Sequence, residues 1–69
     1  MKVNKQKLEL AMANACMNMD DLSESAEVSR ISISKYLLGL RNPKPKTLGK
    51  IAKALNVPVE QLIDLEGGE

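Results

Sequence analysis

The sequence predicts an all-α fold, a compact bundle of about five short helices, and three observations lead to this prediction. Apolar residues recur every three or four positions in several segments, which is the spacing of one helix face. Residue types that begin or end helices lie between these segments. No segment alternates apolar and polar residues as a strand would. We expect residues 1–69 to form a single small domain, with an ordered core at about 4–65 and a flexible tail at 66–69.

The first helix is expected to follow a basic leader at 1–3, with Asn4 as its N-cap and an end near Cys16. Leu10 falls off its apolar face, so we expect this side chain to be exposed. Cys16 is the only cysteine of the chain, and we expect it to be a small, reduced residue of the core. The apolar face of this helix consists of Leu8, Ala11, Met12 and Ala15.

A second, short helix is predicted from Asn18 to about Ala26. Asn18 is a good N-cap, and Asp20 and Asp21 in the first turn interact favourably with the positive end of the helix dipole. Leu22 and Ala26 are one turn apart and form its narrow apolar face.

A third helix of about Arg30 to Leu38 is predicted after a tight corner, with Ser29 as its N-cap and Gly39 as the left-handed residue that closes it. Ile33 and Tyr36 repeat at helical spacing and attach this helix to the bundle. The side chains that project outward are Arg30, Ile31, Ser34 and Lys35. A short helix with hydrogen-bonding groups and net positive charge, held away from its own core, suits the major groove of DNA.

Residues 41–46 cannot form regular structure, because Pro43 and Pro45 remove hydrogen-bond donors and fix the backbone. Pro45 suits the first turn of a fourth helix, which ends at Asn56 in a left-handed conformation. The apolar face of the fourth helix is Leu48, Ile51, Ala52 and Leu55. Pro58 then opens a fifth, short helix. The apolar residues of the fifth helix are Val59, Leu62, Ile63 and Leu65.

The composition argues against several classes of function. One cysteine and no histidine leave no disulfide framework and no metal cluster, and we expect no cofactor. Tyr36 is the only aromatic residue, which argues against a stacking platform for single-stranded nucleic acid. We do not expect an enzyme, because Cys16 has no activating base and no Gly-rich phosphate loop or carboxylate pair appears. No apolar run approaches the ~20 residues of a membrane span, and no signal-peptide pattern is present. We therefore expect no membrane contact and a cytoplasmic location, on the nucleoid when the protein is bound to DNA.

The formal net charge is only +1, but the charged residues are unevenly distributed along the chain. Acidic residues lie mainly at 20–27 and 60–69, on either side of a central basic block. The basic block consists of Arg30, Lys35, Arg41, Lys44, Lys46 and Lys50. Such a block suits a nucleic-acid partner, although lysines of this kind also simply solvate a surface.

Several motifs in correct register resemble a known family. They are Val28-Ser29-Arg30, Ile33-Ser34-Lys35-Tyr36, Gly39, Arg41-Asn42-Pro43, Pro45, Thr47-Leu48, Lys50-Ile51-Ala52-Lys53-Ala54-Leu55 and Val57-Pro58-Val59-Glu60-Gln61-Leu62. Together they look like the helix-turn-helix proteins of the Cro and lambda-repressor class (XRE-like), over roughly residues 5–63. The resemblance implies a lambda-repressor-like bundle whose second and third helices form the helix-turn-helix.

The resemblance also implies sequence-specific binding of double-stranded DNA, with the third helix in the major groove. The residues implied to read bases are Arg30, Ile31, Ser34 and Lys35, with Arg30 on a guanine and Ile31 on a thymine methyl group. The residues implied to contact the sugar–phosphate backbone are Ser29, Met19, Arg41, Asn42 and Lys44. Simpler interpretations stay open: Ser29 is then only a cap, Arg30 and Lys35 are solvated, and Ile31 is partly buried. The proline-rich loop would then only join two helices.

The chain departs from the family pattern at several positions. Met19 replaces a Gln whose side chain reaches a phosphate, which leaves only the amide end of the helix for this contact. Glu27 replaces a Gly in the turn, at a cost of about 1 kcal/mol if its φ is positive. Met12 and Leu37 replace an Arg–Glu ion pair of many relatives, so we predict that Met12 packs on Leu37.

Leu38 and Leu40 replace charged or polar residues near the end of the third helix and would be exposed on a monomer. They are either ordinary exposed leucines or an apolar contact surface for a dimer or a partner protein. The resemblance implies a homodimer on DNA, with core burial as the favoured role of Leu62 and Leu65. The segment implied to form the dimer contact is Asn56, Val57, Pro58 and Val59.

The favoured function is a transcriptional regulator, most simply a repressor that occupies a promoter or operator. The alternative is a protein-interaction module, or an antitoxin-like protein that binds DNA and a partner, in which the helix-turn-helix fold is retained.

Overall fold

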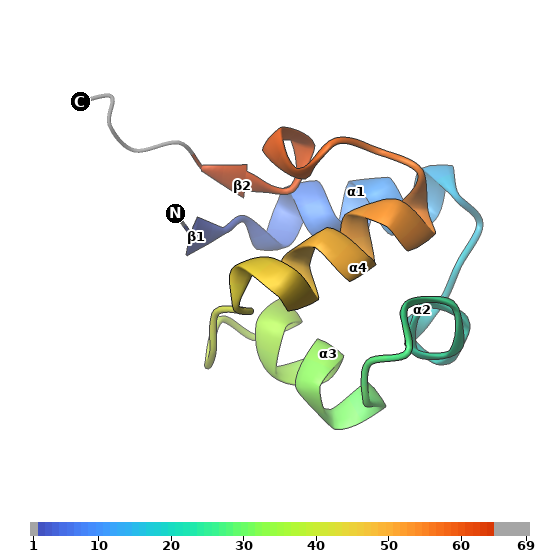
Figure 1. Cartoon of the computed structure of the whole chain (residues 1–69), viewed down its shortest axis with the longest axis horizontal. Coiled ribbons are helices and arrows are strands. Elements are labelled where there is room, and N and C mark those ends of the chain that lie inside the picture. Colours follow the sequence, from blue (N-terminus) through green and yellow to red (C-terminus); the bar gives the residue numbers. More distant parts are fainter. Residues whose placement is uncertain (1, 65–69) are drawn as a thin grey trace.

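The protein is described by a computed structural model that covers residues 2–64. Four α-helices form its body, and a two-stranded sheet joins its ends. In Figure 1, α4 crosses the centre of the molecule, with α1 above it, α3 below it and α2 at the right. The elements are β1 (Lys2–Val3), α1 (Lys5–Asn14), α2 (Met19–Ala26), α3 (Arg30–Leu37), α4 (Pro45–Leu55), the 3₁₀-helix η1 (Val59–Gln61) and β2 (Ile63–Asp64). No helix within residues 2–64 is long and apolar enough to cross a membrane.

The α-helices begin at the residues that the sequence predicts. The side chains of Asn4, Asn18 and Ser29 each accept the backbone N–H of the residue three positions later. At α2 the capping is reciprocal, because the Asp21 carboxylate accepts the Asn18 N–H at 3.1 Å. Helix α4 has no side-chain cap, and Pro45 occupies its first turn.

Each α-helix ends in the same kind of turn, with one residue in the left-handed region. These residues are Cys16, Glu27, Gly39 and Asn56, with φ between 57° and 76°. In each turn, the residue that follows the left-handed one donates its backbone N–H to the carbonyl of the residue five positions earlier in the chain, at 2.9 to 3.2 Å. This bond satisfies one of the carbonyls that the last helical turn leaves without a partner. Gly39 and Asn56 behave as predicted. The prediction for Cys16 is wrong: α1 already ends at Asn14, and Cys16 is the exposed left-handed residue of the closing turn.

The hydrophobic core draws side chains from all four α-helices, and α2 packs against both α3 and α4. The buried residues are Leu8, Ala11, Met12, Leu22, Ala26, Ile33, Tyr36, Leu48, Ile51, Ala52, Leu55, Leu62 and Ile63. These confirm the predicted apolar faces of the four α-helices, except that Ala15 is only half-buried, and Val59 of the predicted fifth helix is half-buried as well. Leu37 is half-buried against the same core that contains Met12, and their direct contact stays a prediction.

The prediction of a fifth α-helix is wrong, as is the expectation of no strand. After Pro58 the chain makes a single 3₁₀ turn, closed by the Leu62 N–H on the Val59 carbonyl at 2.8 Å. The backbone then extends into β2, which pairs antiparallel with β1 through Lys2–Asp64 and Val3–Ile63. Residues 1–3, expected as a leader, therefore include a strand of the fold. Leu65 and the tail at 66–69 lie outside the described residues.

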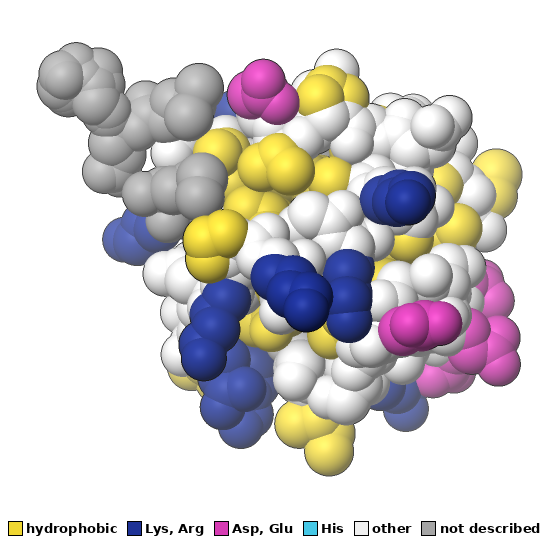
Figure 2. Space-filling view, in the orientation of Figure 1, with side chains coloured by type: hydrophobic (Ala, Val, Ile, Leu, Met, Phe, Trp, Pro, Cys, Tyr) yellow, Lys and Arg dark blue, Asp and Glu magenta, His cyan; other side chains and the backbone are white. Residues whose placement is uncertain are grey.

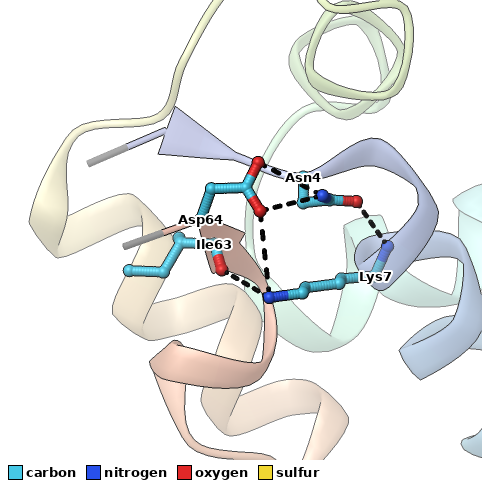
Figure 3. A network of polar contacts seen from close by, with 4 residues as sticks. All are labelled: Asn4, Lys7, Ile63 and Asp64. Carbon is cyan, nitrogen blue, oxygen red and sulfur yellow. Dashed lines mark hydrogen bonds and ion pairs between the residues drawn. The ribbon is translucent and has the colours of Figure 1, made fainter. Parts of the chain in front are cut away.

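Next to this sheet, polar side chains near the first and last described residues form hydrogen bonds with one another (Figure 3). The Asn4 amide nitrogen donates to both carboxylate oxygens of Asp64, at 3.0 and 3.2 Å, while its amide oxygen caps α1. The Lys7 ammonium donates to the Ile63 carbonyl at 3.0 Å and lies 3.8 Å from Asp64. The residue that begins α1 thus also holds the end of the domain.

Candidate nucleic-acid interface

The turn between α2 and α3 is fixed by backbone and side-chain bonds around one strained residue. Glu27 adopts φ 58°, the left-handed conformation that the family assigns to a glycine. The Val28 N–H donates to the Ser23 carbonyl at 3.2 Å, and the Ser23 hydroxyl donates back to the Val28 carbonyl at 2.6 Å. This reciprocal pair fixes the direction in which the chain leaves α2, and therefore the direction of α3.

Helix α3 has an anchored side and a free side. Ile33 and Tyr36 are buried in the core, and Leu37 is half-buried beside them. The side chains of the opposite side are exposed or half-buried; they are Arg30, Ile31, Ser34, Lys35 and Leu38. Helix α3 lies along the lower edge of the molecule in Figure 1, and a hydrophobic side chain protrudes at that edge in Figure 2. The residues predicted to read bases thus share one outward side of a rigidly held helix.

Arg30, at the start of α3, forms an ion pair that the sequence analysis did not foresee. Its Nε lies 3.0 Å from an Asp20 carboxylate oxygen in the first turn of α2, and both side chains remain well exposed. The sequence alone predicts only that Asp20 interacts with the dipole of its own helix. Its partner begins the next helix, and only the tight corner between α2 and α3 brings the two side chains together. A DNA group that binds Arg30 would either share this guanidinium with Asp20 or displace the Asp20 carboxylate.

Two residues predicted at the DNA backbone have local roles in the fold. The Ser29 hydroxyl accepts the Ser32 N–H at 3.1 Å and donates to the Ser32 hydroxyl at 2.9 Å, so it caps α3. Met19 is the first residue of α2 and packs, half-buried, against the core. The nearby Asp21 N–H is already occupied by the Asn18 side chain, at 2.8 Å. Since this first turn also carries two carboxylates, it is a poor site for a phosphate.

The loop between α3 and α4 presents exposed cationic side chains, which line a hollow together with Tyr36 and Thr47. Arg41 and Lys44 are exposed, and they take part in neither of the two ion pairs found within residues 2–64. The Asn42 side-chain oxygen instead accepts the Val3 N–H at 3.3 Å, so Asn42 links the loop to β1. Figure 2 shows Lys and Arg side chains gathered over α4 and the lower left, and Asp and Glu side chains at the right near α2. On this face most Lys and Arg side chains thus lie apart from the Asp and Glu side chains, whereas Arg30 of the basic block pairs with Asp20.

The segment predicted to form a dimer contact lies at the end of α4 opposite to this loop. Its exposed residues are Asn56 and Pro58, and its half-buried residues are Val57 and Val59. Leu62 is fully buried, which confirms the favoured core role and leaves no side-chain surface for a partner. Leu65 lies outside the described residues.

A helix-turn-helix domain is defined by three features together: the capped helix α2, the tight turn with a left-handed residue, and helix α3, which is buried on one side and exposed on the other. A family model described as helix-turn-helix (HTH_3) matches residues 15–62, so the chain belongs to this XRE-type family. Among solved structures, the chain is similar to the restriction-modification controller protein C.AhdI from Aeromonas hydrophila, with a TM-score of 0.80 and 20% sequence identity. That similarity covers 86% of this chain and 89% of the controller protein, and at this identity it shows the fold. A search of curated proteins gave no significant match.

The strained turn yields a prediction about stability. Glu27→Gly removes the β-carbon that disfavours positive φ, so the free energy of unfolding should rise by about 1 kcal/mol. Ser25→Gly, at an exposed position inside α2, is the matched control and should lower it by about 0.5–1 kcal/mol. Urea denaturation followed by circular dichroism measures both changes. A Glu27→Gly variant no more stable than the parent would show that the turn is not strained.

Proposed function

We propose that this protein is a sequence-specific, double-stranded DNA-binding transcriptional regulator that acts as a repressor. The observation that supports this best is the division of α3, whose inward side is fixed in the core while Arg30, Ile31 and Leu38 on its outward side stay exposed. Repression requires only that the protein occupy a promoter or operator. We infer no catalytic role, and a DNA partner implies a cytoplasmic location, on the nucleoid when bound.

The dimensions of α3 support insertion into the major groove. Its eight residues span about 12 Å, and a helix with its side chains is about 10–12 Å wide. The major groove of B-DNA is about 12 Å wide. With α3 in the groove, Arg41 and Lys44 would lie near the flanking phosphates, where they would fix position without reading sequence.

A homodimer on a near-palindromic site is the form we propose on DNA. One α3 contacts only half a site, and two half-sites one helical turn apart are separated by about 34 Å. The longest extent of the domain is 35 Å, which is compatible with two copies side by side on one face of the duplex. The 56–59 segment is the proposed contact between the copies.

The alternative function, a protein-interaction module or antitoxin-like protein, is favoured by one observation. Leu38 and Leu40 are 63% and 72% exposed beside the proposed DNA-reading residues. The salt dependence of binding distinguishes the two functions, because phosphate contacts release counterions and apolar protein contacts do not.

The proposed function is tested by titrating the protein with random duplexes and with duplexes enriched by repeated selection, at two salt concentrations. We expect the enriched duplexes to bind at least 10³-fold tighter than random ones, with affinity falling steeply as salt rises. Mass measurement of the complex should show two protein chains per duplex. Equal affinity for both pools, or a salt-insensitive association with protein alone, would contradict the proposal.

If Arg30 reads a base and Lys44 contacts a phosphate, replacing these two residues should have different effects on DNA binding. Arg30→Ala should cost about 1–3 kcal/mol at one base position of the enriched site and relax the preference there. Lys44→Ala should weaken binding to all sequences alike and reduce the slope of log affinity against log salt by about 1. Competition assays with single-base variants of the site measure both effects. A uniform loss in both variants would show that Arg30 does not read a base.

The ion pair between Asp20 and Arg30 predicts a gain of affinity. Asp20→Asn removes a negative charge near the phosphates, and at about 8 Å in water this should raise affinity for any duplex about two- to three-fold. Because both side chains are exposed, thermal stability should change little. Glu24→Gln removes the same charge from α2 at an exposed residue outside this ion pair, and a smaller effect is expected. Equal effects of the two variants would indicate a general charge effect rather than one exerted at Arg30.

A further inference from the structure

Most of the exposed large hydrophobic side chains of the described structure gather in one place. Ile31, Leu38 and Leu40 are 70%, 63% and 72% exposed, and all three line a single shallow hollow beside α3. Met19 supplies a further apolar wall, and Arg30 and Lys35 lie at the same hollow. The fourth such residue, Leu10, lies on α1 and outside this hollow, which makes it a natural control. The apolar hollow therefore coincides with the residues proposed to read DNA.

The spacing of two of these residues places them on one line along the outward side of α3. Ile31 and Leu38 are seven residues apart, which is two helical turns, so they face the same direction about 10.5 Å from each other along the axis. Both are exposed, whereas Ile33 and Tyr36 on the opposite side are buried. Two aliphatic side chains are thus presented to whatever covers this face.

The chemistry of the hollow restricts its occupant. In the major groove, the apolar group presented by the bases is the 5-methyl group of thymine. The charged residues that line the hollow are both cationic, which complements the phosphates of a duplex. A second copy of this chain fits less well, because two apposed hollows would bring together the Lys35 ammonium groups of both copies, which take part in neither ion pair of the described structure.

We propose, building on the proposed function and on the contact already expected of Ile31, that Leu38 reads a second thymine methyl group, with Leu40 at the edge of the contact. Leu38 is then a specificity-determining residue rather than an ordinary exposed leucine. Base pairs rise about 3.4 Å along the duplex axis and the groove runs oblique to that axis, so a 10.5 Å spacing corresponds to thymines roughly two to three base pairs apart in each half-site.

The first arm of the test removes methyl groups from the DNA. In the best enriched duplex, each thymine is replaced in turn by deoxyuridine, which lacks only the 5-methyl group and keeps its hydrogen bonds. We expect a loss of about four-fold in affinity at two positions roughly two to three base pairs apart, and little change at the others. Uniform insensitivity of a bound duplex to deoxyuridine would overturn this inference and leave the proposed function standing.

The second arm changes the protein. Leu38→Gln should abolish the deoxyuridine effect at one of the two positions and Ile31→Gln at the other, whereas Leu10→Gln should retain both. All three positions are exposed, so circular dichroism should show unchanged folding. If Leu38→Gln retains both deoxyuridine effects, Leu38 does not read a methyl group and the inference fails.

Two further outcomes separate this inference from the function on which it rests. Failure of every duplex, enriched or random, to bind would overturn both. If Leu38→Gln instead abolishes a salt-insensitive self-association or the binding of a partner protein, while affinity for DNA and the deoxyuridine effects are unchanged, the hollow is a protein interface and the inference is overturned alone.

Discussion

The direction of α3 depends on the turn that joins it to α2. Glu27 takes a left-handed conformation that glycine would adopt at lower cost, and the bonds between Ser23 and Val28 hold the chain in that conformation. With the turn fixed, Ile33 and Tyr36 enter the core and the other side of α3 is left outside. The corner also brings Asp20 next to Arg30, so the same turn sets the electrostatics of the exposed side.

The outward side of α3 combines few charges with much apolar surface. On this side Arg30 shares its guanidinium with Asp20, and the first turn of α2 is acidic and already capped. Most of the electrostatic attraction to phosphates must therefore come from the neighbouring loop and α4, where the lysines gather (Figure 2). Such a division would separate the two tasks of a DNA-binding protein, because a cationic flank supplies affinity for any duplex and an aliphatic side discriminates between bases.

The α-helices could be predicted because their signals are local. Asn4, Asn18 and Ser29 lie at the N-caps, Gly39 and Asn56 at left-handed closures, and the apolar spacing identifies the buried faces. The sheet could not be predicted, since each strand has only two residues and the partners are about sixty positions apart. For the same reason, the sequence does not show that Asp64 binds Asn4 or that Val3 binds the side chain of Asn42.

Errors within the helical region concern the ends of helices and the turns that follow them. As a single reduced cysteine, Cys16 is expected in the core, but α1 ends at Asn14 and the closing turn leaves Cys16 exposed. The outward set on α3 was predicted correctly from the periodicity of Ile33 and Tyr36. The clustering of Leu38 and Leu40 with Ile31 in one hollow was not, because it depends on how the chain turns after Gly39.

The central claim is that the outward side of α3 is the surface that meets duplex DNA. Amide chemical-shift mapping of the isotope-labelled protein during titration with an enriched duplex tests it most directly. We predict that the largest shifts fall on residues 29–38 and on the loop at 40–44. In the 56–59 segment, we expect only the shifts that the proposed contact between two copies would cause, and little further change from DNA itself. Shifts confined to other elements, with the amides of α3 unmoved at saturation, would contradict the account.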